Sequence, residues 1–124
     1  MKKLLLFLCF IFCYVFLNGQ TKLTESTFKK AIAKGVVVVE FNAPFNSKNS
    51  FKEHTKLDHC NFYRVCVVGS PDLKKKYRIT SYPTLIVFKS GYAEKKYKGN
   101  IMLELDINYQ EVQEKVDELL MNKF

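Results

Sequence analysis

Four valines stand in a row at Val36–Val39, followed by Glu40 and Phe41. Valine is β-branched, which restricts its rotamers and favours extended backbone over helix. Alternate residues of a strand face opposite sides of a sheet, so an unbroken apolar run predicts a strand that is buried on both faces. Such a strand needs a covering layer on each side, which indicates a central sheet with helices on both faces.

The flanking segments supply those helices and further strands. Helices are predicted at 24–34, 47–57, 70–77 and 108–120, and strands at 36–41, 62–68, 82–88 and 93–98. Their order gives two strand–helix–strand units, a hairpin that turns at Lys89-Ser90-Gly91, and a last helix. Residues 100–107 show no clear pattern. We therefore predict an α/β fold with a mixed sheet, in one domain over residues 20–124, because 124 residues suffice for one domain and not two.

The N-terminus, residues 1–19, is predicted to be a signal peptide. Lys2 and Lys3 precede an uncharged apolar run over 4–17, and the small residue Gly19 follows it. This run is shorter than the roughly 20 residues that span a bilayer. The pattern favours export to the periplasm or the medium. The alternative is an uncleaved segment that anchors the chain in the membrane.

The charge is uneven along the chain. Lys and Arg number 20 against 12 Asp and Glu, yet acidic residues predominate in the last predicted helix. A basic body could attract anionic surfaces, but we favour the simpler interpretation that solvated lysines maintain solubility. Because an exported chain does not meet nucleic acid, we expect a peptide or protein partner, and a membrane only if the N-terminal segment is uncleaved.

Three segments resemble the thioredoxin-like family, and protein disulfide isomerase domains in particular. They are the strand end with its Ala-Pro step at 40–49, the short helix and proline-containing strand at 72–85, and the hairpin with its following glycine at 88–99. They occur in the family's order and together span most of residues 22–120. The resemblance implies a thioredoxin-like fold with a cis bond before Pro83.

The chain departs from the family pattern at the positions that carry sulfur. Asn46 and Asn49 stand where the resemblance places the two cysteines of a Cys-x-x-Cys motif, and Phe45 replaces the usual tryptophan. Disulfide exchange needs a thiolate nucleophile and a resolving thiol, and an amide is neither. We therefore predict a protein that binds or scaffolds, with no catalytic residue and no cofactor.

The resemblance assigns a role to two charged residues. Glu40 corresponds to the family's buried acid, and Arg64 to the basic residue on the neighbouring strand. In active relatives such a carboxylate moves a proton to the resolving thiol. Here no thiol stands at that position. We expect a buried ion pair that stabilises the fold, since removing one partner of such a pair is costly.

The segment around Pro83 is the predicted binding site. In relatives, the backbone beside this proline pairs with an extended peptide, and that surface needs no cysteine. We expect a shallow apolar groove formed by Phe45, Asn46, Tyr82, Pro83 and Thr84. The alternative is that Pro83 only shapes its loop.

Cys60 and Cys66 are the thiols that remain once Cys9 and Cys13 leave with the signal peptide. Six extended residues span about 20 Å, whereas a disulfide needs Cα atoms within about 7 Å. We expect Cys66 to be a buried side chain near Glu40, and Cys60 to be an exposed thiol. A competing hypothesis is a thiol-disulfide oxidoreductase that uses these two cysteines.

Two further hypotheses concern polar residues elsewhere. His54, Asp58, His59 and Cys60 suggest a metal site, but only His54 and Asp58 would share a helix face, and no second cluster completes the ligand set. We therefore expect no metal. The acidic C-terminal helix at 108–120 suggests a third function, that of a structural subunit that docks through this helix.

Overall fold

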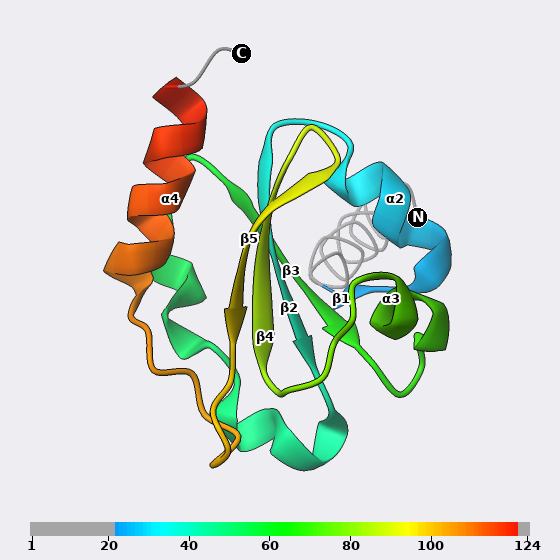
Figure 1. The fold of residues 1–124 in the computed structure, drawn as a ribbon. Coiled ribbons are helices and arrows are strands. Elements are labelled where there is room, and N and C mark those ends of the chain that lie inside the picture. The colour runs from blue at the N-terminus through cyan, green and yellow to red at the C-terminus, as the bar shows by residue number, and fades with distance from the viewer. Residues whose placement is uncertain (1–21, 122–124) are drawn as a thin grey trace, which may run out of the picture.

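The computed structural model describes residues 22–121, so the predicted signal peptide at 1–19 lies outside the described residues. Figure 1 shows the elements in their chain order. They are β1 (Lys22–Leu23), α2 (Glu25–Ile32), β2 (Val36–Asn42), the 3-10 helices η2 (Pro44–Asn49) and η3 (Lys52–Lys56), β3 (Asn61–Cys66), α3 (Pro71–Lys76), β4 (Thr84–Lys89), β5 (Tyr92–Lys98) and α4 (Tyr109–Met121). The predicted mixed α/β fold is confirmed.

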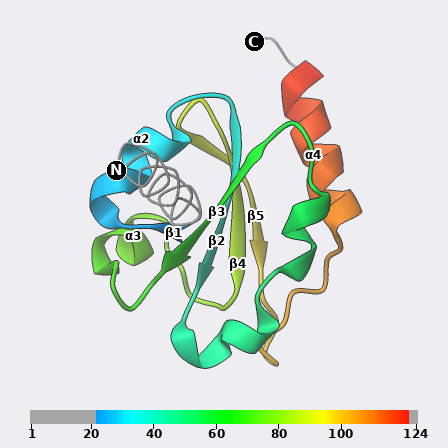
Figure 2. The ribbon, with the colours of Figure 1, turned by 180° about the vertical axis from the view of Figure 1, so that it is seen from behind.

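The sheet has the strand order β1-β3-β2-β4-β5, so β2 lies at its centre. β2 runs parallel to β3 and antiparallel to β4, and β4 pairs with β5 in an antiparallel hairpin. All of β2 is buried except its last residue, as the run of valines predicted. Helices α2 and α3 cover one face of the sheet, and α4 covers the other (Figures 1 and 2).

Alternate residues of β2 contribute to two separate hydrophobic clusters. Val37, Val39 and Phe41 pack with Phe28 of α2. Val36 and Val38 pack on the opposite face with the valines of α4. Each fully buried Val or Phe side chain contributes about 1.5–3 kcal/mol. The period of two along β2 is therefore what holds both helical layers against the sheet.

The hairpin and the last helix follow their sequence signals. Ser90 and Gly91 have φ of 51° and 87°, the positive values that a two-residue hairpin turn between twisted strands requires. At the start of α4, Asn108 Oδ1 accepts the backbone N–H of Glu111 at 3.1 Å. On α4 the residues Val112, Val116 and Leu119 are buried, whereas Leu120 is exposed.

The predicted helix over 47–57 is wrong. The chain instead forms η2 and η3, which are separated by extended backbone with ψ of 151° at Ser50 and 98° at Phe51. The cause is a competing acceptor: the backbone N–H of Phe51 donates to Glu40 Oε2 at 2.6 Å and closes no helical turn. This bond also places the Phe51 ring in the cluster beneath α4.

Two segments carried too little sequence signal. β1 is two residues long, too short for a periodic pattern, and pairs with the edge of β3. Residues 100–107 form no strand but a loop, in which Asn100 Oδ1 accepts the N–H groups of Met102 and Glu104. Among residues 22–121, no helix has the length and apolar character needed to cross a membrane.

Candidate functional site

The candidate site begins where β2 leaves the sheet. Asn42 is the last residue of the strand, and Ala43 precedes η2 with Pro44 at the first helical position. Proline suits that position because its missing N–H has no helical partner there in any case. The tight turn brings Asn46 and Asn49 back toward Asn42. We call these three asparagines the amide cluster.

Asn46 lies at the centre of the amide cluster and is buried, with 2% of its surface exposed. Its Nδ2 donates to Asn42 Oδ1 and to the backbone carbonyl of Leu103, both at 3.1 Å. Its Oδ1 accepts from Asn49 Nδ2 at 2.9 Å. Both donor hydrogens and the acceptor oxygen of this side chain are therefore in use.

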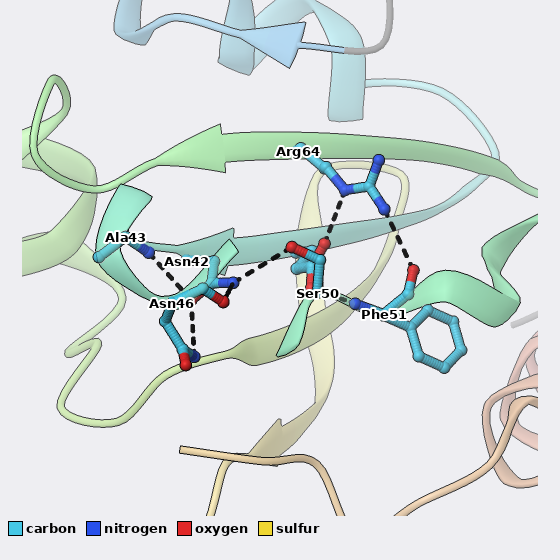
Figure 3. Close-up of polar contacts among 7 residues, drawn as sticks. Asn42, Ala43, Asn46, Ser50, Phe51 and Arg64 are labelled. Atoms are coloured by element: carbon cyan, nitrogen blue, oxygen red, sulfur yellow. Dashed lines mark hydrogen bonds and ion pairs between the residues drawn. The ribbon is translucent and has the colours of Figure 1, made fainter. Parts of the chain in front are cut away.

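Asn42 joins the amide cluster to the backbone of η2. Its Oδ1 also accepts the Ala43 N–H at 2.9 Å. Its Nδ2 donates to the Asn46 carbonyl at 3.0 Å and to Ser50 Oγ at 3.4 Å, as Figure 3 shows. The cluster is neutral and holds neither a thiol nor a basic group. It fixes the shape of the turn and offers no nucleophile.

Glu40 and Arg64 form the predicted ion pair, although the Arg64 side chain is 34% exposed and the pair is buried only on the Glu40 side. The two residues are register partners on β2 and β3, and Arg64 Nε donates to Glu40 Oε1 at 2.8 Å. Glu40 is fully buried. Its second oxygen accepts the Phe51 N–H, and Arg64 Nη2 donates to the Phe51 carbonyl at 3.2 Å (Figure 3). Both carboxylate oxygens thus already accept bonds from the protein.

The five residues predicted to form a groove divide between surface and interior. Asn46, Pro83 and Thr84 are buried. Phe45 is 69% exposed, and its ring lies edge-on to the half-buried Tyr82 ring with 5.9 Å between centroids. The Tyr82–Pro83 peptide bond is cis. Of the five, only Phe45 and Tyr82 present side chains that a partner can contact.

The loop after β5 adds two exposed apolar residues that the sequence reasoning missed. Ile101 is 98% exposed and Met102 is 69% exposed. This loop lies beside η2 because the next residue, Leu103, accepts the bond from Asn46 (Figure 1). The sequence signal that could have identified this exposed surface is the presence of two large apolar residues in a stretch without periodicity. We call Phe45, Tyr82, Ile101 and Met102 the apolar patch.

Gly99 holds the loop against Tyr82. A Cβ atom at Gly99 would lie 2.2 Å from the Tyr82 carbonyl oxygen and 2.9 Å from that of Pro83. No other residue permits so close an approach of two backbone segments. The glycine that the resemblance placed before the last helix therefore fixes one side of the apolar patch.

The expected positions of the thiols are wrong. Cys66 is exposed, because it is the last residue of β3, opposite Asn42, where the covered part of the sheet ends. Cys60 is half-buried and packs against the cluster beneath α4. Burial, with the nearby acids Asp58 and Asp117, raises the pKa of Cys60 to about 11. Both cysteines are free thiols.

The residues that suggested a metal site have separate structural roles. The ring of His54 stacks on Phe62 at 4.5 Å between centroids, and burial lowers the pKa of His54, with a further contribution from Arg64. The backbone N–H of Asp58 donates to Gln113 of α4 at 2.8 Å. Over the described part of the chain, no three His, Cys, Asp or Glu side chains form a group that could hold a metal ion.

Comparison with known proteins gives a consistent result. The Thioredoxin family model matches residues 19–111. A mutant thioredoxin from Halobacterium salinarum is 14% identical with a TM-score of 0.64, over 78% of this chain and 87% of that one. Thioredoxin from Malassezia sympodialis is 20% identical with a TM-score of 0.60, over the same shares. Chloroplastic thioredoxin z is 17% identical with a TM-score of 0.60, over 82% and 94%.

These solved structures share the fold of this chain. Because their sequence identities are low, the similarity shows the fold alone. The family model, in contrast, spans most of the sequence, from the residues before β1 to the first turn of α4. It includes the central strand, the cis-proline segment and the hairpin described above. The chain belongs to the thioredoxin family.

Proposed function

We propose that this thioredoxin-family protein performs no disulfide exchange and instead binds a peptide or protein partner at the apolar patch. The amide cluster carries the proposal. Asn46 and Asn49 stand at the positions where the family resemblance places sulfur, and their side chains hydrogen-bond to one another. Neither amide can attack a disulfide, because that reaction requires a thiolate.

The acid of the site supports the same proposal. A carboxylate that assists thiol exchange must exchange protons with the reacting sulfur. Glu40 is instead held by Arg64 on one oxygen and by the Phe51 N–H on the other. Arg64 in turn bonds the Phe51 carbonyl. The pair thus fixes the break between η2 and η3, which is a structural role.

The exposed residues of the apolar patch support binding. Three of them, Phe45, Ile101 and Met102, leave more than two thirds of their surface exposed. Apolar surface removed from water contributes about 25 cal/mol per Å², and aromatic side chains are frequent anchors at interfaces. Underneath, the bond from Asn46 to Leu103 joins η2 to the loop. The patch is therefore held in place before a partner arrives.

The competing oxidoreductase hypothesis finds no support in the thiols. Cys60 directly precedes strand β3, and Cys66 is the last residue of that strand. Six extended residues place them about 20 Å apart, too far for an internal disulfide. The raised pKa of Cys60, about 11, also keeps this thiol protonated at neutral pH.

The redox half of the proposal is tested by insulin reduction with dithiothreitol. The purified protein is expected to give the rate of dithiothreitol alone, while an active thioredoxin accelerates it. The Cys60→Ser/Cys66→Ser variant should give the same rate as the parent chain. Acceleration comparable to the active enzyme would contradict the proposal, and its loss in the variant would assign the activity to these two thiols.

The binding half is tested by selecting peptides from a displayed random library on the immobilised protein. Phe45→Ser and Met102→Ser are expected to weaken the selected peptides by tenfold or more. The matched control is Tyr92→Ser on β5, because Tyr92 is 74% exposed and Phe45 is 69% exposed. Failure to select any peptide, or an equal loss in the control, would contradict binding at the apolar patch.

We further propose that the protein acts outside the cytoplasm after cleavage near Gln20. The support is the cationic start and apolar run of residues 1–19. Expression of the full chain should yield an exported species, and mass spectrometry should find its N-terminus near Gln20. A full-length species that stays in the membrane fraction would favour the uncleaved anchor instead.

A further inference from the structure

We infer that the partner segment is acidic and extends from the apolar patch into a basic hollow beside α3. This inference rests on the proposed function, because it names the chemistry of the partner at that surface. The basic hollow has a volume of about 640 Å³. Its apolar floor and wall are Val67, Val68 and Ile79, and its cationic side chains are Lys74, Lys75 and Arg78.

The apolar part of the hollow suits an anchoring side chain. Val67 and Ile79 are buried members of the core and form a fixed floor. Val68 is 71% exposed although it is a large apolar residue. A partner side chain of leucine or phenylalanine size would cover it and gain the burial of apolar surface on both sides.

Within the described part of the chain, the cations of the hollow form no ion pair. The ion pairs found within residues 22–121 join Lys56 to Glu53, Arg64 to Glu40 and Lys115 to Glu118. None of them involves α3. Two acids lie in the surroundings: Asp72 is on α3 itself, where its N–H donates to the Glu25 carboxylate at 2.7 Å, and Glu94 of β5 lines a separate pocket with Arg78.

The neighbouring strand extends the positive charge. Lys96 of β5 donates to the carbonyl of Tyr77, which precedes Arg78. Burial lowers the pKa of Lys96, and the like charges of Lys98 and Arg78 lower it further. Carboxylates from a partner would relieve this repulsion, which gives the hollow a preference for acidic residues.

The basic hollow and the apolar patch are continuous. Lys74 Nζ lies 5.8 Å from the centroid of the Tyr82 ring. That ring in turn lies 5.9 Å from the ring of Phe45. One extended segment can therefore contact Phe45, pass over Tyr82 and reach Lys74, at about 3.3 Å per residue.

The shape of the surface favours a peptide over other anionic partners. A membrane offers phosphates on a broad plane, which a hollow does not match. Single-stranded nucleic acid requires aromatic platforms for successive bases, and the walls of this hollow are aliphatic. A chain that alternates carboxylates with leucine or phenylalanine fits both the cations and the floor.

The probe is a fluorescein-labelled synthetic peptide that alternates glutamate with leucine and contains one phenylalanine, measured by fluorescence anisotropy. A second peptide has glutamine in place of every glutamate. The acidic peptide is expected to bind at least tenfold more tightly. Lys74→Glu/Lys75→Glu should remove this difference, and Val68→Ser should weaken both peptides by a few-fold.

The matched control is Lys29→Glu/Lys30→Glu. These lysines also lie in the last turn of a helix, α2, and both pairs are exposed. The two variants therefore change net charge equally and perturb a helix end equally. At physiological ionic strength charges are screened over about 8 Å, so the control should bind the acidic peptide within twofold of the parent protein.

The outcomes separate this inference from the proposed function. If Phe45→Ser weakens both peptides while Lys74→Glu/Lys75→Glu changes nothing, the apolar patch stands and the acidic partner is overturned. If neither Phe45→Ser nor Lys74→Glu/Lys75→Glu changes binding, both the proposed function and this inference are overturned. An equal loss in the α2 control overturns the inference as non-specific attraction. Displacement of the peptide by phosphatidylglycerol vesicles would also overturn the inference. A salt-sensitive dimer that Lys74→Glu/Lys75→Glu dissociates would overturn it as well.

Discussion

Two polar clusters lie at the end of β2, and they solve the same burial problem differently. In one, the fully buried Glu40 meets Arg64 as a charged pair. In the other, Asn46 is 2% exposed and lies between two further amides. The first matches what the thioredoxin family resemblance implies, and the second departs from it. Figure 3 shows Asn42 and Asn46 of the amide cluster in the same region as Arg64 of the charged pair, which comes from the neighbouring strand β3.

The difference between the charged pair and the amide cluster indicates on which part of the site the fold depends. A buried charge needs its own counter-charge, so neither Glu40 nor Arg64 can change alone without cost. An amide carries donors and an acceptor in one side chain, so asparagines satisfy one another without charge. Under the proposed function, the charged pair therefore serves the fold and takes no part in thiol chemistry. Substitutions in the charged pair, in the amide cluster and at the cysteines test this difference.

The largest effect is expected for Arg64→Ala. This change leaves the Glu40 carboxylate fully buried without its counter-charge, because the remaining partner, the Phe51 N–H, is neutral. Loss of one partner of a fully buried pair costs about 3–5 kcal/mol, and because the Arg64 side chain is 34% exposed the cost here should lie at the lower end of that range. The free energy of unfolding should fall by this amount in urea denaturation.

A double variant serves as the control for this prediction. Glu40→Gln/Arg64→Ala replaces the orphaned charge by a neutral amide that can still accept the Phe51 N–H. It should be more stable than Arg64→Ala alone. If the double variant is instead destabilised by the sum of the single changes, the pair contributes no coupling and the structural role assigned to it is wrong.

A smaller effect is expected for Asn46→Ala. The substitution leaves the Leu103 carbonyl and the Asn49 amide without their present partners. An unsatisfied buried polar group costs about 1–3 kcal/mol. Because the bond to Leu103 holds the loop, hydrogen exchange should also increase at Met102 and Leu103. Unchanged exchange there would show that the amide cluster does not position the apolar patch.

Much of the fold could be predicted from the sequence because its signals are local and consistent. The valine run gave the buried central strand, Ser90-Gly91 the hairpin, and Asn108 the start of α4. The helix over 47–57 failed for a non-local reason. The Glu40 carboxylate takes the Phe51 N–H from eleven residues away and breaks the helix in two.

The site was predictable only where the family resemblance supplied a partner. The resemblance implied the pairing of Glu40 with Arg64, and the two residues are register partners joined by a hydrogen bond. The burial of Asn46 depends on a carbonyl 57 residues away, at Leu103, which no local pattern reveals. Ile101 and Met102 belong to an irregular loop that is placed by Gly99 against Tyr82. Such a contact is a property of the folded chain.

The smallest effect is expected for substitution of a cysteine, and this substitution tests whether a thiol takes part in the site. Cys66 is exposed opposite Asn42, so Cys66→Ser should change the free energy of unfolding by no more than about 0.5 kcal/mol. In the native protein at about pH 8, iodoacetamide should label Cys66 at least tenfold faster than Cys60.

The pH dependence of iodoacetamide labelling shows whether the low reactivity expected for Cys60 is due to its burial. The pKa of Cys60 is raised from 9.0 to about 11, mainly by burial, so its native thiolate forms only as the pH rises toward that value. The raised pKa also means that the native state keeps this proton longer than the unfolded chain does. The protonated Cys60 thiol therefore contributes to the free energy of unfolding below about pH 9, and this contribution is lost between pH 9 and 11. In urea, where burial is gone, both cysteines should react at similar rates. Equal rates in the native protein at about pH 8 would instead show that Cys60 is a reactive thiol and would reopen the case for thiol chemistry in this scaffold.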